Sequence, residues 1–173
     1  RQPTAEQRLG MGEVVLRDTF ESRSGWLVGQ YNGGTAAYSR QRLDVVTQPA
    51  LGASVVVLRS GTIPADFYFE MSVSPSLCRG KDSYGLIFRA EGELSHYRLF
   101  ITCEGQVRVE RWRPAEVGVV QDWMPSGQVP AGAPITLRLG VWMFRDEMRI
   151  FINDIYQFSA RDRLLQGGRR GGL

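Results

Sequence analysis

Two acidic residues of this chain fall where catalysis could use them. Glu70 and Glu110 each lie within a segment of alternating polar and apolar residues, and hydrolysis of a glycosidic bond needs two carboxyl groups about 5–9 Å apart. Other catalytic arrangements are missing, because His96 is the only histidine, no nucleophile elbow occurs, and no glycines join a strand to a helix as in a phosphate-binding loop. We therefore expect no catalytic motif, with a glycoside hydrolase using Glu70 and Glu110 as the alternative.

A second group of side chains suits binding. Arg89, Tyr97 and Trp112 occur on three successive segments of alternating polarity, and Arg108 and Glu110 precede Trp112 at two-residue intervals. Sugars stack their apolar faces on aromatic rings while polar side chains hydrogen-bond their hydroxyls. We expect these five residues to bind a ligand, with a glycan favoured, although Trp112 could equally be a packing residue. A packing role is expected for the other tryptophans, Trp26, Trp123 and Trp142.

Cysteine and histidine usage argues against a metal site. Cys78 and Cys103 are the only cysteines, and His96 does not stand at a metal-site spacing from either of them. A tetrahedral zinc site needs four ligands, and no loop is dense enough in Asp and Asn to suggest calcium. We expect neither a metal nor another cofactor.

Composition favours one domain that binds neither nucleic acid nor the membrane interior. A length of 173 residues is typical of one domain, and no stretch approaches the roughly 18 consecutive apolar residues of a membrane span. Of the 21 basic residues, Lys81 is the only lysine. This arginine bias could serve phosphate or carboxylate binding, but the arginines alternate along the expected strands beside 18 acidic residues, so we favour compositional bias and ion pairing. The densest basic cluster, which lacks the interleaved aromatics of a nucleic-acid site, is Arg161, Arg163, Arg169 and Arg170.

Alternation of apolar and polar residues from Val14 onward predicts an all-β fold. Every second residue from Phe67 to Val73 is apolar, and the pattern returns over 135–141 and 148–152, as is typical of half-buried antiparallel strands. Further strands are expected at 14–19, 25–30, 36–46, 53–58, 83–89, 97–103, 106–112 and 117–122, with one helical turn at 160–166. Such short strands separated by turn residues predict a two-sheet antiparallel jelly-roll sandwich over 14–173, preceded by a polar tether or linker over 1–13.

A register follows for the three central segments if Glu104-Gly105 is a two-residue hairpin turn. Tyr97 then faces Trp112, and a symmetric 90–96 loop makes Arg89 face Tyr97. One side of this unit becomes a core face, made of Leu86, Phe88, Phe100, Val107 and Val109. The other side becomes the floor of a groove, with the rows Arg89–Tyr97–Trp112, Ile87–Leu99–Glu110 and Gly85–Ile101–Arg108. A slip of one residue would exchange the two faces.

The same register leads to predictions about the partner of Cys78 and the direction of Glu70. It puts Cys103 opposite Ser83, five residues after Cys78, so a loop could join the two sulfurs in a disulfide, which would stabilise the fold by about 3 kcal/mol. Two buried free thiols are the alternative. Glu70 projects away from the core side of its strand, so it could face the same groove as Glu110.

Several short motifs follow one another in a familiar order. They are Asp18-Thr-Phe20 followed by Gly25-Trp26, then Tyr84-Gly-Leu-Ile-Phe-Arg89, Tyr97-Arg-Leu-Phe-Ile101, Trp112, Phe151-Ile-Asn-Asp154 and the closing Gly167-Gly-Arg-Arg-Gly-Gly-Leu173. Together they resemble the concanavalin A-like lectin/glucanase superfamily, and most of all the laminin G-like and 3-keto-disaccharide-hydrolase-type domains of bacterial exported proteins. The resemblance covers roughly Val14 to Leu173 and implies a jelly-roll fold outside the cytoplasm. It leaves the function open, because this superfamily hosts lectins, hydrolases and adhesion modules.

Two departures from the superfamily narrow these expectations. The glucanase string Glu-x-Asp-x-x-Glu is absent, so we expect a non-catalytic, extracytoplasmic binding module, with a hydrolase or a structural subunit of a cell-surface assembly as alternatives. In relatives the closing Gly-rich element also leads into one last strand, which we expect to be absent from this chain or to come from elsewhere. We expect that slot to be filled by a continuation of the polypeptide, by a protein partner, or by residues 1–12 folding back.

Overall fold

Residues 7–173 are described by a computed structural model, in which strands make up nearly all of the regular structure. The strands are β1 (Gly29–Tyr31), β2 (Gly34–Ser39), β3 (Arg42–Thr47), β4 (Phe67–Val73), β5 (Ser83–Ala90), β6 (His96–Thr102), β7 (Gln106–Arg113), β8 (Glu116–Pro125), β9 (Leu137–Phe144), β10 (Glu147–Ile152), β11 (Ile155–Arg161) and β12 (Arg170–Gly172). The all-β prediction is confirmed. No helix in this part of the chain has the length and apolar character needed to cross a membrane.

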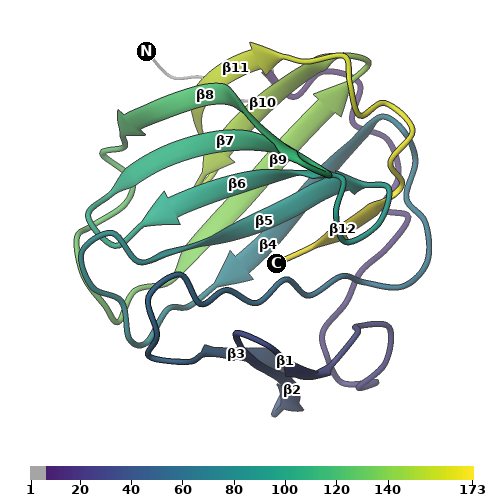
Figure 1. Cartoon of the computed structure of the whole chain (residues 1–173). Coiled ribbons are helices and arrows are strands. Elements are labelled where there is room, and N and C mark those ends of the chain that lie inside the picture. The colour runs from purple at the N-terminus through teal and green to yellow at the C-terminus, as the bar shows by residue number, and fades with distance from the viewer. Residues whose placement is uncertain (1–6) are drawn as a thin grey trace.

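Two larger sheets form the sandwich, and a small third sheet lies beside it (Figure 1). The five-stranded sheet has the order β12-β5-β6-β7-β8, and the four-stranded sheet has the order β11-β10-β9-β4. All pairs of neighbouring strands are antiparallel. The chain crosses from one large sheet to the other after β4, β8 and β11, which gives the predicted two-sheet antiparallel sandwich.

The core fills the space between the two large sheets, and the alternating residues supply it. Leu137, Leu139 and Val141 of β9 are buried, as are the alternate residues of β10. The apolar residues of β4 pack against this cluster from the edge of the four-stranded sheet. Each fully buried side chain of this kind contributes roughly 1.5–3 kcal/mol relative to an exposed one, so the alternation decides which side of each strand faces inward.

The turn between β6 and β7 differs from the predicted one. It contains three residues, Cys103 to Gly105, because Ile101 pairs with Val107. The Gly105 N–H donates to the Thr102 carbonyl oxygen (3.0 Å), and Gly105 has a φ of 86°, where glycine is favoured. A Cβ at Gly105 would also lie 2.8 Å from the Val129 carbonyl oxygen. This is a three-residue hairpin loop that ends in a left-handed glycine.

The extra turn residue reverses the two faces of β6. Tyr97 pairs with Arg111 and not with Trp112, which lies opposite His96. Tyr97, Leu99 and Ile101 are therefore buried in the core, whereas Phe100 turns outward. On β5 and β7, the residues predicted for the core face and for the outer face do lie on those faces, apart from Arg89 at the end of β5. The predicted register is thus wrong for one strand, and the cause is a slip of a single residue.

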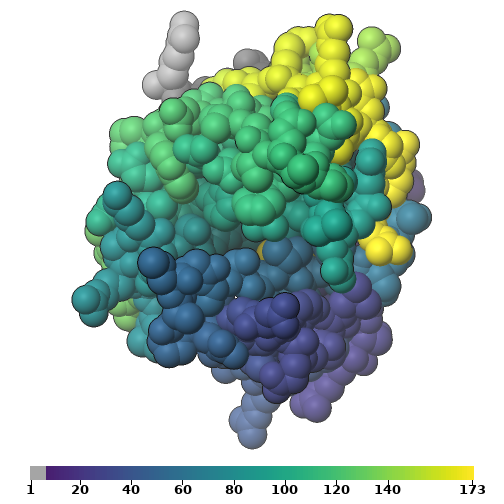
Figure 2. Space-filling model, viewed as in Figure 1, coloured from purple at the N-terminus to yellow at the C-terminus, as the bar shows by residue number. Residues whose placement is uncertain are grey.

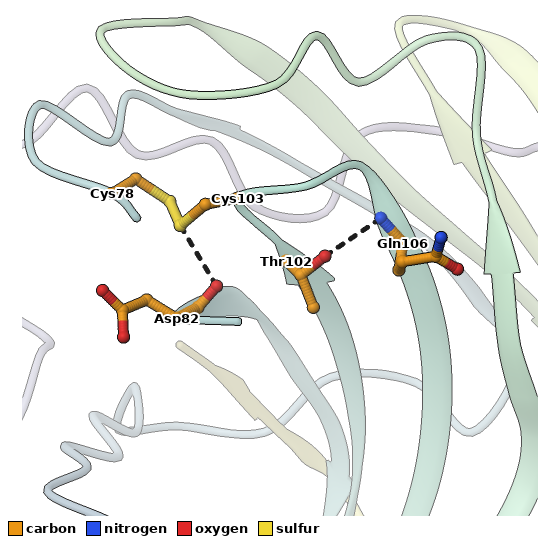
Figure 3. Close-up of a disulfide and its surroundings, with 5 residues drawn as sticks. All are labelled: Cys78, Asp82, Thr102, Cys103 and Gln106. Carbon is orange, nitrogen blue, oxygen red and sulfur yellow. Dashed lines mark hydrogen bonds between the residues drawn. A yellow bond between two sulfur atoms is a disulfide. The ribbon is translucent and has the colours of Figure 1, made fainter. Parts of the chain in front are cut away.

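The predicted disulfide is confirmed: Cys78 and Cys103 are bonded, with Cα atoms 5.5 Å apart (Figure 3). Cys103 is buried, and its Sγ lies 3.1 Å from the Asp82 carbonyl oxygen. The Gln106 N–H donates to Oγ1 of Thr102 (3.0 Å) across the adjoining turn. The disulfide therefore ties the loop between β4 and β5 to the β6–β7 turn at one end of the sandwich.

The end of the chain forms a paired strand. β12 pairs with β5 on one side. On its other side, Val57 exchanges two backbone hydrogen bonds with Leu173 (both 2.9 Å), and the Arg59 N–H donates to the Gly171 carbonyl oxygen (3.0 Å). The edge of β12 that faces away from β5 is thus paired with Val57–Arg59. A further strand beyond Leu173 stays a prediction.

The three-stranded sheet covers the side of the sandwich where β4 and β12 lie (Figure 1). Trp26, Ala36 and Val57 form its buried centre, and Met71 of β4 and Leu173 pack against them. The strand expected at 36–46 is interrupted at Arg40-Gln41 and forms the β2–β3 hairpin. The segment expected as a strand at 14–19 has no regular structure.

The helical turn expected at 160–166 is not formed, because β11 runs to Arg161 and residues 162–166 have no regular structure. Ile152 pairs with Ile155, so Asn153 and Asp154 form a two-residue turn. Both have positive φ angles, 51° and 64°, which matches the turn type that suits the twist of a hairpin. The turn leads β10 into β11, which continues to Arg161.

Gln7 to Leu9 lie against the outer face of the four-stranded sheet. The Trp142 indole N–H donates to the Leu9 carbonyl oxygen (2.9 Å), and Arg149 donates to that of Gln7 (2.9 Å). The Arg8 guanidinium lies 5.2 Å from the ring centres of both Tyr68 and Phe151. Of the tether expected over 1–13, residues 1–6 are outside the described part of the chain.

Candidate ligand-binding face

The outer face of the five-stranded sheet carries the side chains that β5, β6 and β7 turn away from the core. Figure 2 views the molecule from this side, with the three-stranded sheet below it. The register aligns these side chains in rows across the strands. The rows are Gly85–Phe100–Arg108, Ile87–Arg98–Glu110–Val119 and His96–Trp112–Val117. Of the five residues predicted to bind a ligand, the structure brings together Arg108, Glu110 and Trp112.

Trp123 is the most exposed aromatic ring on this face, with 42% of its surface accessible. Its ring centre lies 6.5 Å from that of Phe100, and the Arg108 guanidinium lies 5.5 Å from it. Trp123 reaches this position where β8 bulges opposite Val107 to Glu110. Gly85 continues the row beyond Phe100 and leaves no side chain above the sheet. We call Phe100, Arg108 and Trp123 the aromatic platform.

Trp112 stands beside the platform and is held more firmly. The Arg98 guanidinium stacks 3.7 Å from its ring centre, and its indole N–H donates to Glu110 (2.9 Å). Trp112 remains half-buried and lines a shallow pocket of about 380 Å³ with the β7–β8 turn. One ring face is therefore already covered by a protein cation, which leaves less of Trp112 for a ligand than of Trp123.

His96 is buried beneath this group and is neutral. Arg98 Nε donates to His96 Nε2 (2.8 Å), so that nitrogen must carry a lone pair. Burial, and next the positive charge of Arg98, lower the pKa of His96 to about 4. At neutral pH the imidazole therefore accepts a hydrogen bond and adds no charge to the face.

Charged groups of both signs border the aromatic platform. Arg108 Nε lies 2.8 Å from a Glu110 carboxylate oxygen, and its Nη1 donates to Asp122 (3.0 Å). Asp122 is 76% exposed at its side chain. Donors and acceptors thus stand next to exposed ring surface, which is the combination that hydroxyl-rich ligands require. Over residues 7–173, no three His, Cys, Asp or Glu side chains are grouped so as to hold a metal ion.

Arg89 and Tyr97, which were predicted for this face, point elsewhere. Tyr97 is fully buried and stacks on Phe88 with ring centres 5.3 Å apart. Arg89 has a φ of 48°, which ends the alternation of β5 and turns its guanidinium toward the Ala65 carbonyl oxygen (3.0 Å). The predicted row Arg89–Tyr97–Trp112 is therefore wrong. The three-residue turn after β6 and the left-handed residue at the end of β5 are the two causes.

Tyr97 anchors the loop that follows β11. Its hydroxyl donates to Asp162 (2.7 Å) and accepts from the Leu165 N–H (3.3 Å). Burial first, and then the bond to Asp162, raise the pKa of Tyr97, so the hydroxyl stays protonated and acts as a donor. Asp162 also pairs with Arg111 of β7. This network links the loop after β11 to β6 through Tyr97 and to β7 through Arg111.

Glu70 and Glu110 lie on opposite outer faces of the sandwich. On β4 the core side is taken by Phe69 and Met71, so Glu70 points outward from the four-stranded sheet, where Tyr68 donates to it (2.9 Å). On β7 the core side is taken by Val109, so Glu110 points outward from the five-stranded sheet. Two sheets packed about 10 Å apart separate them, and they cannot flank one glycosidic bond. The expectation that both face one groove is wrong.

Phe100 and Trp123 belong to the face but were predicted to be packing residues, and Arg98 was not among the residues predicted for it. Phe100 and Arg98 follow from the reversal of β6. Trp123 lies one residue beyond the strand expected at 117–122, where the bulges of β8 break the alternation. A usable signal was present in Cys103-Glu104-Gly105, because a glycine at the third turn position suits a three-residue loop. The packing expected of Trp26 and Trp142 is confirmed, since both are buried.

The fold has counterparts among solved structures. No family model and no curated protein matches the sequence. The carbohydrate binding module CBM66 from Bacillus subtilis matches with a TM-score of 0.66 at 18% identity, over 86% of this chain and 86% of that one. Sheep galectin-11, in complex with glycerol, matches with a TM-score of 0.52 at 15% identity, over 66% of this chain and 86% of that one. At these identities the likeness establishes the fold alone, a two-sheet antiparallel β-sandwich.

Proposed function

We propose that this chain is a non-catalytic carbohydrate-binding module that acts outside the cytoplasm and binds its glycan on the outer face of the five-stranded sheet. The exposed indole of Trp123, beside Phe100 and Arg108, carries this proposal. A large exposed aromatic ring loses contact with water when a sugar stacks on it, and this favours binding. Among the tryptophans, only Trp123 leaves so large a share of its surface open, since Trp112 is half-buried and the others are buried.

Polar groups around the platform suit a hydroxylated ligand. Arg108 provides donors, and the carboxylates of Glu110 and Asp122 provide acceptors within the same group. The names of the two structural counterparts, a carbohydrate binding module and a galectin, support the same class of ligand.

Two finer points belong to the same proposal. The disulfide supports an oxidising compartment, because cytosolic proteins seldom keep structural disulfides. Within the superfamily, the motif order favours the laminin G-like and 3-keto-disaccharide-hydrolase-type domains. A hydrolase is not favoured, since the two carboxylates considered for it lie on opposite faces of the sandwich.

A glycan array with matched variants tests the proposal. Wild-type protein should bind a restricted set of glycans, and Trp123→Ala should weaken that binding about tenfold or more, because the stacking surface is lost. Phe144→Ala is the control, since Phe144 is an equally exposed aromatic (46%) on the opposite sheet, and it should leave binding unchanged.

Three outcomes would contradict the proposal. Wild-type protein that binds no glycan would indicate a structural module. Equal losses in Trp123→Ala and Phe144→Ala would place the ligand elsewhere. Release of reducing sugar from the bound polysaccharides would show that the module is catalytic.

A further inference from the structure

One end of the sandwich holds an arginine-lined pocket that the proposed glycan face does not use. It lies where β4 begins, where β5 and β11 end, and beside the β9–β10 turn, and its volume is about 720 Å³. This volume lies within the usual range for small-molecule sites. The basic residues that line it are Arg89, Arg145, Arg161, Arg163 and Arg169. Three of them come from the basic cluster noted in the sequence.

Arg89 is the buried member of this group. It is 1% exposed, and its Nη2 donates to the Ala65 carbonyl oxygen (3.0 Å). Asp66 is its nearest carboxylate, at 3.6 Å. Its Nε and Nη1 have no hydrogen-bond acceptor among residues 7–173. Buried charged donors without acceptors are costly, so the pocket as formed by the protein leaves Arg89 incompletely satisfied.

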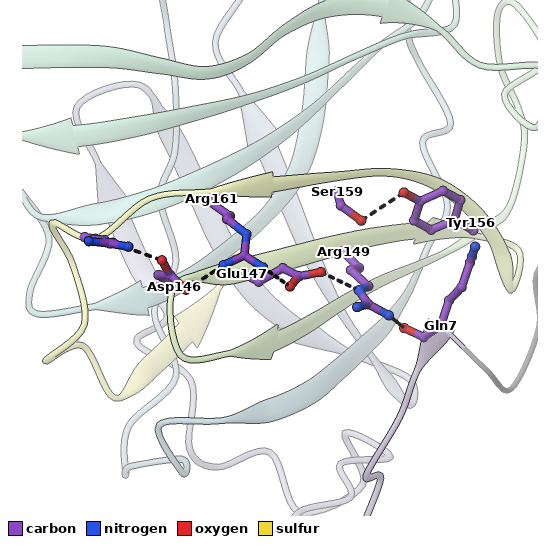
Figure 4. A network of polar contacts seen from close by, with 8 residues as sticks. Gln7, Asp146, Glu147, Arg149, Tyr156, Ser159 and Arg161 are labelled. Atoms are coloured by element: carbon purple, nitrogen blue, oxygen red, sulfur yellow. Dashed lines mark hydrogen bonds and ion pairs between the residues drawn. The ribbon is translucent and has the colours of Figure 1, made fainter.

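Two of the other arginines are neutralised by neighbouring carboxylates. Asp146 lies 3.5 Å from Arg161 and 3.0 Å from Arg163. Glu147 lies 2.9 Å from Arg161 and also pairs with Arg149. Figure 4 shows these contacts as a chain along β10 and β11. Arg161 and Arg163 therefore belong to a structural ion-pair network.

Arg145 and Arg169 have no such compensation within the described residues. Arg169 Nη1 donates only to the backbone carbonyl oxygens of Gln166 (2.9 Å) and Gly168 (3.1 Å). The Arg145 guanidinium lies over Phe144 at 5.3 Å. Neither guanidinium lies within ion-pair distance of a carboxylate in residues 7–173. Arg169 also lies close enough to lower the pKa of Arg89, after the larger effect of burial.

Arginine-rich composition alone does not account for this arrangement. Many arginines elsewhere on the surface meet carboxylates, as Arg42 does with Asp44 (2.7 Å) and Arg113 with Glu116 (3.4 Å). In the pocket, three guanidinium groups face one shared space with Asp66 as the only carboxylate left to them. Such an excess of like charge is relieved by a bound anion, and the planar guanidinium suits carboxylate, sulfate and phosphate groups.

We propose that this pocket is a second binding site, specific for an oxyanion, with Arg89, Arg145 and Arg169 as its ligand-binding residues. The anion is a carboxylate, sulfate or phosphate group that is either free or carried on a sugar. The pocket has room for the sugar, and Gln166 lines it as a hydrogen-bonding partner for hydroxyls. This site is separate from the aromatic platform and does not depend on the proposed glycan face.

Isothermal titration calorimetry with phosphate, sulfate and glucuronate tests the site, with ionic strength held constant by sodium chloride. We expect saturable binding of one anion per chain. Arg169→Gln and Arg145→Gln should each weaken it about tenfold or more, because each removes a charged donor. Arg42→Gln, which removes the same charge from a 68% exposed side chain on β3, should change affinity by less than about twofold.

The three anions distinguish the source of the ligand. Similar affinity for phosphate and sulfate, with weak glucuronate binding, would indicate a free inorganic anion or a phosphorylated or sulfated group. Tighter binding of glucuronate would indicate an acidic sugar whose hydroxyls also contact the pocket. Either pattern supports an oxyanion site.

Three results would overturn the site. One is that none of the three anions binds saturably at concentrations up to about 1 mM, since a dissociation constant above this value means weak affinity. Another is an equal loss in Arg42→Gln, which would show non-specific attraction. The third is loss of anion binding in Trp123→Ala, which would move the anion to the aromatic platform. Retained anion binding in Trp123→Ala with lost glycan binding would separate the two sites.

Discussion

His96 is the residue whose protonation would disturb the candidate face most directly. It accepts a hydrogen bond from Arg98, which in turn stacks on Trp112. A proton on His96 Nε2 would remove that hydrogen bond and place a positive charge next to the positive charge of Arg98. The pKa of His96, lowered to about 4 by burial and by Arg98, shows that the folded protein resists this protonation.

We predict an acid-side loss of stability that depends on His96. The unfolded chain has an ordinary histidine pKa near 6.5, so between about pH 6.5 and pH 4 the unfolded state binds more protons than the folded state, and the free energy of unfolding falls as the pH falls. Urea denaturation at several pH values should show this slope in the wild type. His96→Gln keeps an acceptor but does not titrate, so its slope in this window should be smaller. Identical slopes in the two proteins would contradict the assignment.

Single residues also explain where sequence reasoning succeeded and where it failed. The alternation around Val107 and Val109 was sufficient to place Glu110, Arg108 and Trp112 on one outer face. It could not place Tyr97, because a tyrosine ring suits a core and a binding face equally. Arg89 was misplaced because its left-handed backbone conformation is uncommon for a residue other than glycine.

Among the elements, the β6–β7 turn accounts for most of the difference between the predicted and the observed strand faces. Cys103-Glu104-Gly105 can be read as a two-residue turn or a three-residue turn, and the two choices put opposite sides of β6 outward. β11 was not predicted, because Asn153-Asp154 was considered only as part of a superfamily motif and not as a two-residue hairpin turn. The disulfide was predictable because both possible turns bring Cys103 near the loop that holds Cys78.

The pairing of β12 gives an element-scale prediction. Deletion of Arg170 to Leu173 should lower the free energy of unfolding by at least about 3 kcal/mol, because three backbone hydrogen bonds to Val57 and Arg59 are lost at about 1 kcal/mol each, together with the pairing to β5. It also leaves the edge of β5 open, and open edges recruit strands of other molecules. Thermal denaturation and size-exclusion chromatography measure both effects. Arg170→Ser is the control, since Arg170 is exposed, and it should behave as the wild type. A deletion variant that stays monomeric with unchanged stability would show that β12 adds nothing to the sheet.

For the whole molecule, the periodicity of the sequence predicted a two-sheet sandwich but not the third sheet. Alternation reports which residues are buried and does not report which strands are neighbours, and β1 to β3 form a separate layer beside the sandwich. The arginine pocket was also beyond sequence reasoning. It is assembled from four separate segments, and in the sequence its basic residues resemble the many arginines that form ion pairs elsewhere in the chain.

The four tryptophans are distributed over the molecule in a way that reports where a glycan binds. Trp112 and Trp123 lie on the outer face of the five-stranded sheet, Trp142 lies on the four-stranded sheet, and Trp26 lies in the centre of the small-sheet layer. Each indole N–H gives its own NMR signal, which can be assigned with single Trp→Phe variants.

Titration of the best array glycan into ¹⁵N-labelled protein, followed by these indole signals, is the most direct test of the proposed binding face. We predict that the Trp123 signal shifts most, that the Trp112 signal shifts less because Arg98 covers one side of its ring, and that Trp26 and Trp142 stay unchanged. Shifts confined to Trp26 or Trp142, or no indole shift at saturating glycan, would contradict binding on the outer face of the five-stranded sheet.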